Sequence, residues 1–149
     1  MKVAVAADHA GSLLITAIVE EVRRLGHEAL DLGTHEAATP DDYPDRAAEL
    51  AVALNSGRAE RGILVCGSGV GASIAANKVR GIRAALCHDS YSAHQGVEHD
   101  QMNVLCLGSR VVGEALALEL VRIFLTAEIS QEPRHQRRVG KIAAMESRF

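Results

Sequence analysis

Short apolar runs alternate along the chain with segments in which apolar residues recur every three or four positions. The short runs are typical of buried strands, whereas the three-to-four spacing is typical of amphipathic helices. The expected strands are Lys2–Ala7, Glu28–Leu32, Arg61–Cys66, Ala84–Cys87 and Val104–Leu107. The expected helices are Ser12–Leu25, Asp45–Asn55, Ile74–Lys78, Ser90–Glu98, Gly113–Thr126 and Glu132–Phe149.

This alternation predicts an α/β fold, a doubly wound, Rossmann-like (flavodoxin-like) sheet. We expect five parallel strands with helices on both faces, and an extra C-terminal helix that packs on another subunit. At 149 residues, the chain is predicted to form one domain, residues 1–149. Ligands of such sheets bind beyond the C-terminal ends of the strands, near the point where strand order reverses. The residues that follow each strand are therefore the first candidates for a site.

Composition narrows the class of protein. Hydrophobic residues make up 48% of the chain, but only two Tyr and two Phe are aromatic, which suits close-packed helices on a parallel sheet. The net charge of −3 gives no reason to expect a nucleic-acid partner. The chain starts directly with a strand pattern, and no apolar run reaches the length of a membrane span. We therefore expect a soluble, cytoplasmic protein without membrane contact.

The cysteines and histidines do not indicate a metal site. The chain has three cysteines, Cys66, Cys87 and Cys106, and none of them is in a CxxC motif. An odd number without this spacing argues against a disulfide framework and a metal site, so we expect reduced thiols at strand ends. For Cys87 and Cys106 we favour a position in the core. His94 and His99 are five residues apart and would diverge by roughly 140° on a helix. We expect neither a metal nor another cofactor.

The most informative motif is the turn Cys66-Gly67-Ser68-Gly69-Val70-Gly71 after the third expected strand. Backbone N–H groups in such a turn lack intrahelical partners and point at whatever lies above the strand, so an oxyanion or a phosphate is a natural occupant. The glycine spacing matches neither GxGxxG nor a P-loop, which argues against a dinucleotide or a nucleoside triphosphate. The alternative is a turn that serves only tight packing of strand against helix.

Other polar groups follow the remaining strands. Asp8 and His9 follow the first strand, and Arg110 follows the last. For Asp8 and His9 the alternative is a helix cap with a surface histidine. Arg134 and Arg138 are four residues apart, so on a helix they share a face and could grip a phosphate. The alternative for this pair is a basic helix face in water.

These motifs resemble the ribose-5-phosphate isomerase B family, which also includes galactose-6-phosphate isomerase subunits. The resemblance runs from end to end and is closer to the pentose enzymes. Besides the Cys66 turn, it rests on Asp8-His9-Ala10-Gly11, Ala75-Ala76-Asn77-Lys78, Gly81-Ile82-Arg83-Ala84, Tyr91-Ser92-Ala93, Glu98-His99, Asn103-Val104-Leu105, Gly108-Ser109-Arg110 and Arg134-His135-Gln136. The resemblance implies an aldose–ketose isomerase of carbohydrate metabolism, in the pentose phosphate pathway. It would interconvert ribose 5-phosphate and ribulose 5-phosphate through a cis-enediolate.

The resemblance also implies catalytic roles. Cys66 would move a proton between C1 and C2, and Ser68 would shuttle the proton between the two oxygens. The backbone N–H groups from Gly67 to Gly71, including Gly69 and Val70, would hold the enediolate oxygen. The positive end of the following helix should favour the thiolate of Cys66. His99 would open the furanose ring with help from Asp8.

For the phosphate, the resemblance implies His9, Arg134 and Arg138, with Arg110 as a further candidate. Members of the family build the site between two subunits, with the His99 side contributed by the partner. A homodimer, or a tetramer, with shared active sites is therefore expected.

One residue departs from the family pattern. Asp100 stands where relatives commonly have an Asn that contacts the sugar or enediolate oxygens, and a carboxylate there would oppose a developing oxyanion unless it were protonated or turned away. Either Asp100 binds a sugar hydroxyl, or the substrate is another aldose phosphate, such as a tetrose, allose or galactose phosphate.

A non-catalytic sugar-phosphate-binding protein is a further alternative, although mere binding needs neither a thiol nor a proton shuttle. A phosphoacceptor domain of the same fold would need an acidic cluster that Asp8 alone does not supply.

Overall fold

A computed structural model describes all residues, 1–149. Five parallel strands form one sheet in the order β2-β1-β3-β5-β4. The strands are β1 (Lys2–Ala7), β2 (Glu28–Asp31), β3 (Arg61–Cys66), β4 (Ala84–Leu86) and β5 (Val104–Gly108). The helices are α1 (Ser12–Arg24), α2 (Tyr43–Asn55), α3 (Val70–Ala76), α4 (Ser90–Asp100), α5 (Glu114–Thr126) and α6 (Pro133–Arg148), and a 3₁₀ turn, η1 (His9–Gly11), precedes α1. The predicted doubly wound α/β fold with an extra C-terminal helix is confirmed.

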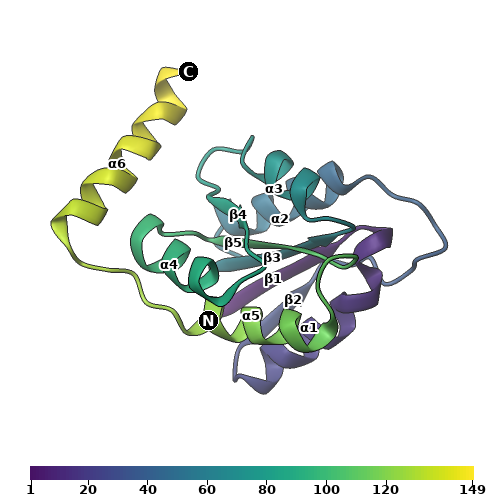
Figure 1. Cartoon of the computed structure of the whole chain (residues 1–149). Helices are drawn as coiled ribbons and strands as arrows, with labels where there is room; N and C mark the ends of the chain where they lie inside the picture. The colour runs from purple at the N-terminus through teal and green to yellow at the C-terminus, as the bar shows by residue number, and fades with distance from the viewer.

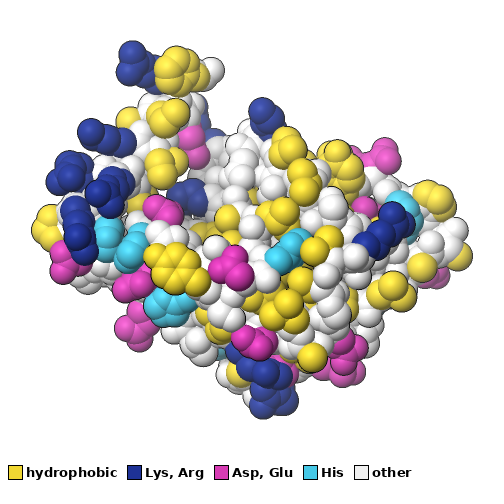
Figure 2. All heavy atoms as spheres, in the orientation of Figure 1, with side chains coloured by type: hydrophobic (Ala, Val, Ile, Leu, Met, Phe, Trp, Pro, Cys, Tyr) yellow, Lys and Arg dark blue, Asp and Glu magenta, His cyan; other side chains and the backbone are white.

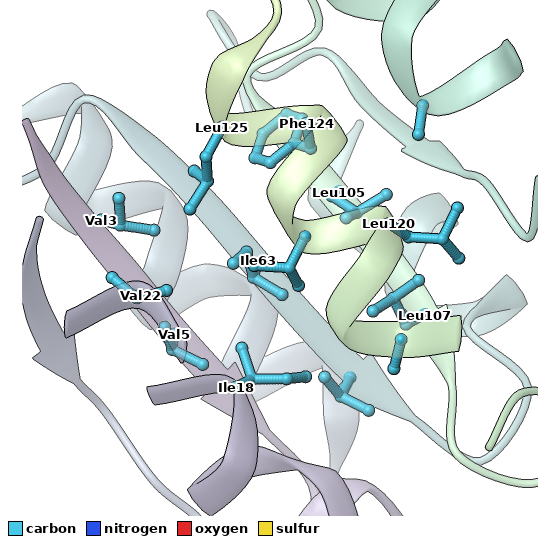
Figure 3. Close-up of a cluster of buried hydrophobic side chains, with 14 of the residues drawn as sticks. Val3, Val5, Ile18, Val22, Ile63, Leu105, Leu107, Leu120, Phe124 and Leu125 are labelled. Carbon is cyan, nitrogen blue, oxygen red and sulfur yellow. The ribbon is translucent and has the colours of Figure 1, made fainter. Parts of the chain in front are cut away.

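Alternate residues of the strands point to two separate cores. Val3 and Val5 of β1 pack with α1, α4 and α5 on one face, and Figure 3 shows the side chains of this core. Ala4 and Ala6 face the opposite side, where α2 and α3 cover the sheet (Figure 1). Because helices cover both faces of the sheet, the strands are apolar almost throughout. This is why short apolar runs in the sequence predict them.

Several element ends differ from the sequence prediction. β2 and β4 each end one residue early, at Asp31 and Leu86, and β5 continues to Gly108. The structure starts α2 at Tyr43 rather than Asp45, and α4 reaches Asp100 rather than Glu98. The last turn of α4 therefore includes His99.

The helix expected at 74–78 is α3, which begins earlier, at Val70, and ends at Ala76. Asn77 explains where it ends, since its side-chain amide donates to the Ala84 carbonyl and its side-chain oxygen accepts from the Ala84 N–H. This pair of hydrogen bonds turns the chain into β4. None of the helices has the length and apolar character needed to cross a bilayer.

The C-terminal helix α6 stands apart from the sheet, with the chain terminus at its far end (Figure 1). It contacts α4, and Glu146 near its end accepts a hydrogen bond from the Gly81 N–H at 2.9 Å. Between α6 and the body lies an open groove of about 960 Å³. Ile142, Met145 and Phe149 line its α6 side and are 40%, 56% and 92% exposed. The expectation that this helix packs on another subunit remains a prediction.

Candidate functional site

The strand order reverses between β1 and β3, so the crevice beyond their C-terminal ends is where a doubly wound sheet places its ligand. A cavity of about 390 Å³ opens there. It is lined by Asp8, His9, Ala10, Tyr43, Cys66, Gly67, Ser68, Gly71, Arg110 and Val111. The structure thus brings together residues that lie after three different strands, as the strand-end argument predicted.

Four residues of the Cys66 turn, Cys66, Gly67, Ser68 and Gly71, line this cavity, whereas Gly69 and Val70 do not. Cys66 is 4% exposed, and its Sγ accepts a hydrogen bond from the Gly69 N–H at 3.1 Å. The thiolate is the form of cysteine that acts as a nucleophile or a base. Gly69 has φ +79°, a left-handed conformation that glycine adopts without strain. The Ser68 Oγ accepts from the Val70 N–H at 3.2 Å.

The loop that follows β5 holds the turn in place. The Ser109 N–H donates to the Cys66 carbonyl at 2.9 Å, and the Arg110 N–H donates to the Gly67 carbonyl at 3.0 Å. These bonds fix the position of Arg110 relative to the thiol. The turn therefore presents a thiol, a hydroxyl and backbone donors in one fixed arrangement, which is suited to moving protons on a small oxygen-rich ligand.

The other two cysteines lie in the core. Burial raises the pKa of the Cys87 thiol to about 11, and it raises the pKa of Cys106 further. Both thiols therefore stay protonated and unreactive. Of the three cysteines, only Cys66 lines the cavity and has a backbone N–H that donates to its sulfur. No cluster of three or more His, Cys, Asp or Glu side chains is arranged to hold a metal ion.

Asp8 and His9 meet different partners. The Asp8 carboxylate is 5% exposed and accepts from the Gly11 N–H at 2.9 Å, so it caps η1 while also facing the cavity. His9 contacts Asp41, a residue 32 positions along the chain that the sequence did not single out. Tyr43, which lines the cavity, is a second residue that the sequence did not indicate. Its ring packs so closely on Gly71 that a methyl group there would lie 2.6 Å from Tyr43 Cζ.

His99 lies in a second cluster, formed by α4 and α6. Its ring stacks on the His135 ring, with centroids 3.9 Å apart. His135 is buried, and burial lowers its pKa, with the neighbouring His99 ring adding to the effect. Gln95 Nε2 contacts His99 Nδ1 at 3.1 Å and donates to Asp100 Oδ2 at 3.3 Å, so the Asp100 carboxylate is engaged within its own chain.

Arg134 and Arg138 extend from this second cluster. Both are exposed on α6, four residues apart, and the Arg134 side chain reaches Glu132 at 3.8 Å. Figure 2 shows Lys and Arg side chains gathered along this helix. None of His99, Asp100, Arg134 and Arg138 lines the Cys66 cavity, whereas Asp100 lines the groove beside α6. One chain thus separates the expected site residues into two groups.

Comparisons with known proteins agree with this geometry. The ribose/galactose isomerase family model matches residues 3–142. Ribose-5-phosphate isomerase B of Escherichia coli (strain K12) is 45% identical over 99% of this chain and 97% of its own length. D-erythrulose-4-phosphate isomerase of Pectobacterium atrosepticum is 41% identical over 86% of this chain and 84% of its own length.

Solved structures are similar as well. Ribose-5-phosphate isomerase B from Clostridium thermocellum superimposes with a TM-score of 0.94 at 47% identity, covering 99% of both chains. The enzyme of the same name from Mycoplasma genitalium, with bound ribulose 5-phosphate, gives a TM-score of 0.92 at 38% identity. That match covers 99% of this chain and 97% of the other.

Proposed function

Because the chain belongs to the ribose/galactose isomerase family and is a sugar-phosphate isomerase, we propose that it interconverts ribose 5-phosphate and ribulose 5-phosphate. The observation that carries the proposal is the cavity lined together by Cys66, Ser68 and two glycines of one turn, Gly67 and Gly71. Its volume, about 390 Å³, lies in the range of small-molecule sites.

In the proposed reaction, the Cys66 thiolate removes the proton from C2 of the open-chain aldose. The electron pair forms the C1–C2 double bond of a cis-enediolate, and the same thiol returns the proton to C1 to give the ketose. Ser68 carries the hydroxyl proton between O2 and O1. The N–H groups of Gly67 and Gly71, which line the cavity, are proposed to stabilise the negative oxygen, whereas the N–H groups of Gly69 and Val70 donate to the Cys66 thiol and the Ser68 hydroxyl.

The remaining roles follow from charge and position. His9 and Arg110 line the same cavity and are proposed to bind the phosphate. His99, with Asp8, is proposed to open the furanose ring, and Arg134 and Arg138 are proposed to complete the phosphate site. Since the second group does not line the cavity of its own chain, we propose that a second copy supplies it. The assembly would be a homodimer, or a tetramer built from it.

Subunit mixing tests the shared site. Cys66→Ala and His99→Asn should each be inactive alone. If each site combines Cys66 of one chain with His99 of the other, random reassociation restores about a quarter of the sites, because half of the dimers are mixed and each holds one intact site. The measurement is isomerase activity after co-refolding, with each variant refolded alone as the control. Activity that stays at the level of the single variants would contradict sharing.

A tetrose phosphate is the second candidate substrate. It is supported by the similarity to D-erythrulose-4-phosphate isomerase and by Asp100, whose carboxylate is bound to Gln95. A carboxylate held in this way cannot donate a hydrogen bond to a sugar or enediolate oxygen. If Asp100 binds the substrate, its carboxylate must accept a hydrogen bond from a sugar hydroxyl. Allose and galactose phosphates remain further candidates.

Proton NMR in heavy water tests the reaction. With ribose 5-phosphate and a chelator present, we expect ribulose 5-phosphate to appear with deuterium at C1, because the thiol proton exchanges with solvent before it is returned. A panel of tetrose, pentose and hexose phosphates then ranks the substrates by kcat/KM. Conversion of a tetrose but not of ribose 5-phosphate would reject the pentose proposal, and binding without any conversion would reject isomerisation.

A further inference from the structure

The segment between β2 and α2 returns to the mouth of the cavity and places Asp41 against His9. The His9 backbone N–H donates to Asp41 Oδ1 at 2.6 Å. The imidazole Nδ1 lies 3.3 Å from the same carboxylate oxygen and 3.2 Å from both the backbone nitrogen and the carbonyl oxygen of Asp41. Asp41 thus holds both the backbone and the ring of His9, although it does not itself line the cavity.

These contacts fix which ring nitrogen of His9 faces Asp41. In neutral His9, Nδ1 can accept from the Asp41 backbone N–H or donate to the Asp41 carbonyl or carboxylate, and only the first arrangement places the ring proton on Nε2. In protonated His9, Nδ1–H faces the carboxylate and the carbonyl of Asp41, and Nε2 again carries a proton. Nε2 makes no polar contact within the chain. In protonated His9, and in the neutral form with its proton on Nε2, this nitrogen is therefore left as a free donor on a residue that lines the cavity.

Asp41 is itself held in place. The Thr34 hydroxyl donates to Asp41 Oδ2 at 2.9 Å, and Arg46 Nε lies 3.4 Å from the same oxygen. Burial alone would raise the pKa of Asp41, but the hydrogen bonds from His9 and Thr34 and the charge of Arg46 together hold it below its ordinary value. Asp41 therefore remains a carboxylate when the enzyme works near neutral pH.

We propose that Asp41 is a positioning residue for phosphate recognition, which orients His9 so that Nε2–H donates to the phosphate of the sugar. The proposal rests on the proposed function, because that function supplies the phosphorylated ligand. It runs against simple electrostatics, since a carboxylate near an anion site should weaken anion binding. Removing the Asp41 charge should therefore tighten phosphate binding if electrostatics alone decides, and weaken it if Asp41 positions His9.

Asp41→Asn keeps the volume of the side chain but removes its charge and one acceptor. We expect inorganic phosphate, measured by calorimetry, to bind about 5- to 10-fold more weakly, because a charge-assisted hydrogen bond that orients the donor is lost. The KM for ribose 5-phosphate should rise by a similar factor, with kcat little changed. Asp41→Glu keeps the charge but displaces it, and should weaken binding as well.

Asp45→Asn is the matched control. It makes the same chemical change on an exposed residue in the first turn of α2 that has no side-chain hydrogen bond. Phosphate binding by this variant should be unchanged or slightly tighter, as the loss of a distant negative charge predicts. Equal or tighter binding by Asp41→Asn would overturn the inference.

A double-mutant cycle separates positioning from general structural damage. In a His9→Ala background, Asp41→Asn should cause no further loss of phosphate affinity, because the side chain that it orients is gone. A loss of the same size in that background would overturn the inference and leave the proposed isomerase intact. Phosphate binding is measured without turnover, so the inference is decided even if ribose 5-phosphate is not converted. Failure of every sugar phosphate to react would count against the proposed function instead.

Discussion

Replacing Cys66 by serine is expected to lower kcat/KM for the isomerase reaction by about 10³-fold or more. A serine hydroxyl has nearly the same size but is far less acidic than a thiol, so it cannot supply the base near neutral pH. Because the cavity and its N–H donors remain, phosphate binding should change little. Steady-state kinetics and calorimetry with inorganic phosphate measure the two effects, and deuterium should no longer enter the product.

Cys106→Ala provides the control for this variant. Cys106 is fully buried on the same face of the sheet as Cys66, but its thiol lies outside the cavity. The variant should keep its activity and lose about 1 kcal/mol of stability from the small void that it creates. If Cys66→Ser turned over substrate as fast as Cys106→Ala, Cys66 would not be the base.

Gly69→Ala is expected to damage both stability and activity. A Cβ at this position would lie 2.5 Å from Leu86 Cδ1 and 2.9 Å from the Leu107 carbonyl carbon, and the backbone φ is +79°. The left-handed conformation and the overlap together should cost about 2–4 kcal/mol of unfolding free energy. Relief of the overlap would move the Gly69 N–H away from Cys66 Sγ, so kcat/KM should also fall by about 10²-fold. Denaturant unfolding and kinetics measure the two losses.

Gly140→Ala is the corresponding control, because a Cβ at Gly140 meets nothing within 4 Å in the exposed helix α6. Its unfolding free energy should stay the same or rise by up to about 1 kcal/mol, since alanine favours a helix over glycine. If both alanine variants matched the wild type in stability and kinetics, the turn would not need glycine at position 69.

Strand and helix positions could be predicted because they depend on local periodicity. The bounds of β1 and β3 agree with the prediction to the residue, since each is an apolar run covered on both faces and closed by polar or glycine residues. The end of α3 could not be predicted in this way. It depends on two hydrogen bonds between the Asn77 side chain and the Ala84 backbone, across a turn, and the spacing of apolar residues does not indicate such bonds.

The sequence also indicated half of the candidate site. Residues that directly follow β1, β3 and β5 meet in one cavity, because the carboxyl ends of parallel strands share an edge of the sheet. The sequence by itself thus determined the fold class, the strand ends where chemistry collects and, through motif resemblance, the family of enzymes.

Only the tertiary structure decided which distant residues complete these groups. Asp41 reaches His9 across 32 positions, and His135 stacks on His99 although the two lie on different helices. The structure also placed His99 and the α6 arginines outside the cavity of Cys66. Such contacts depend on how the crossover segments pack against one another. Local patterns of apolar and polar residues specify where an element forms and which face it buries, but not which side chain from elsewhere in the chain will meet it.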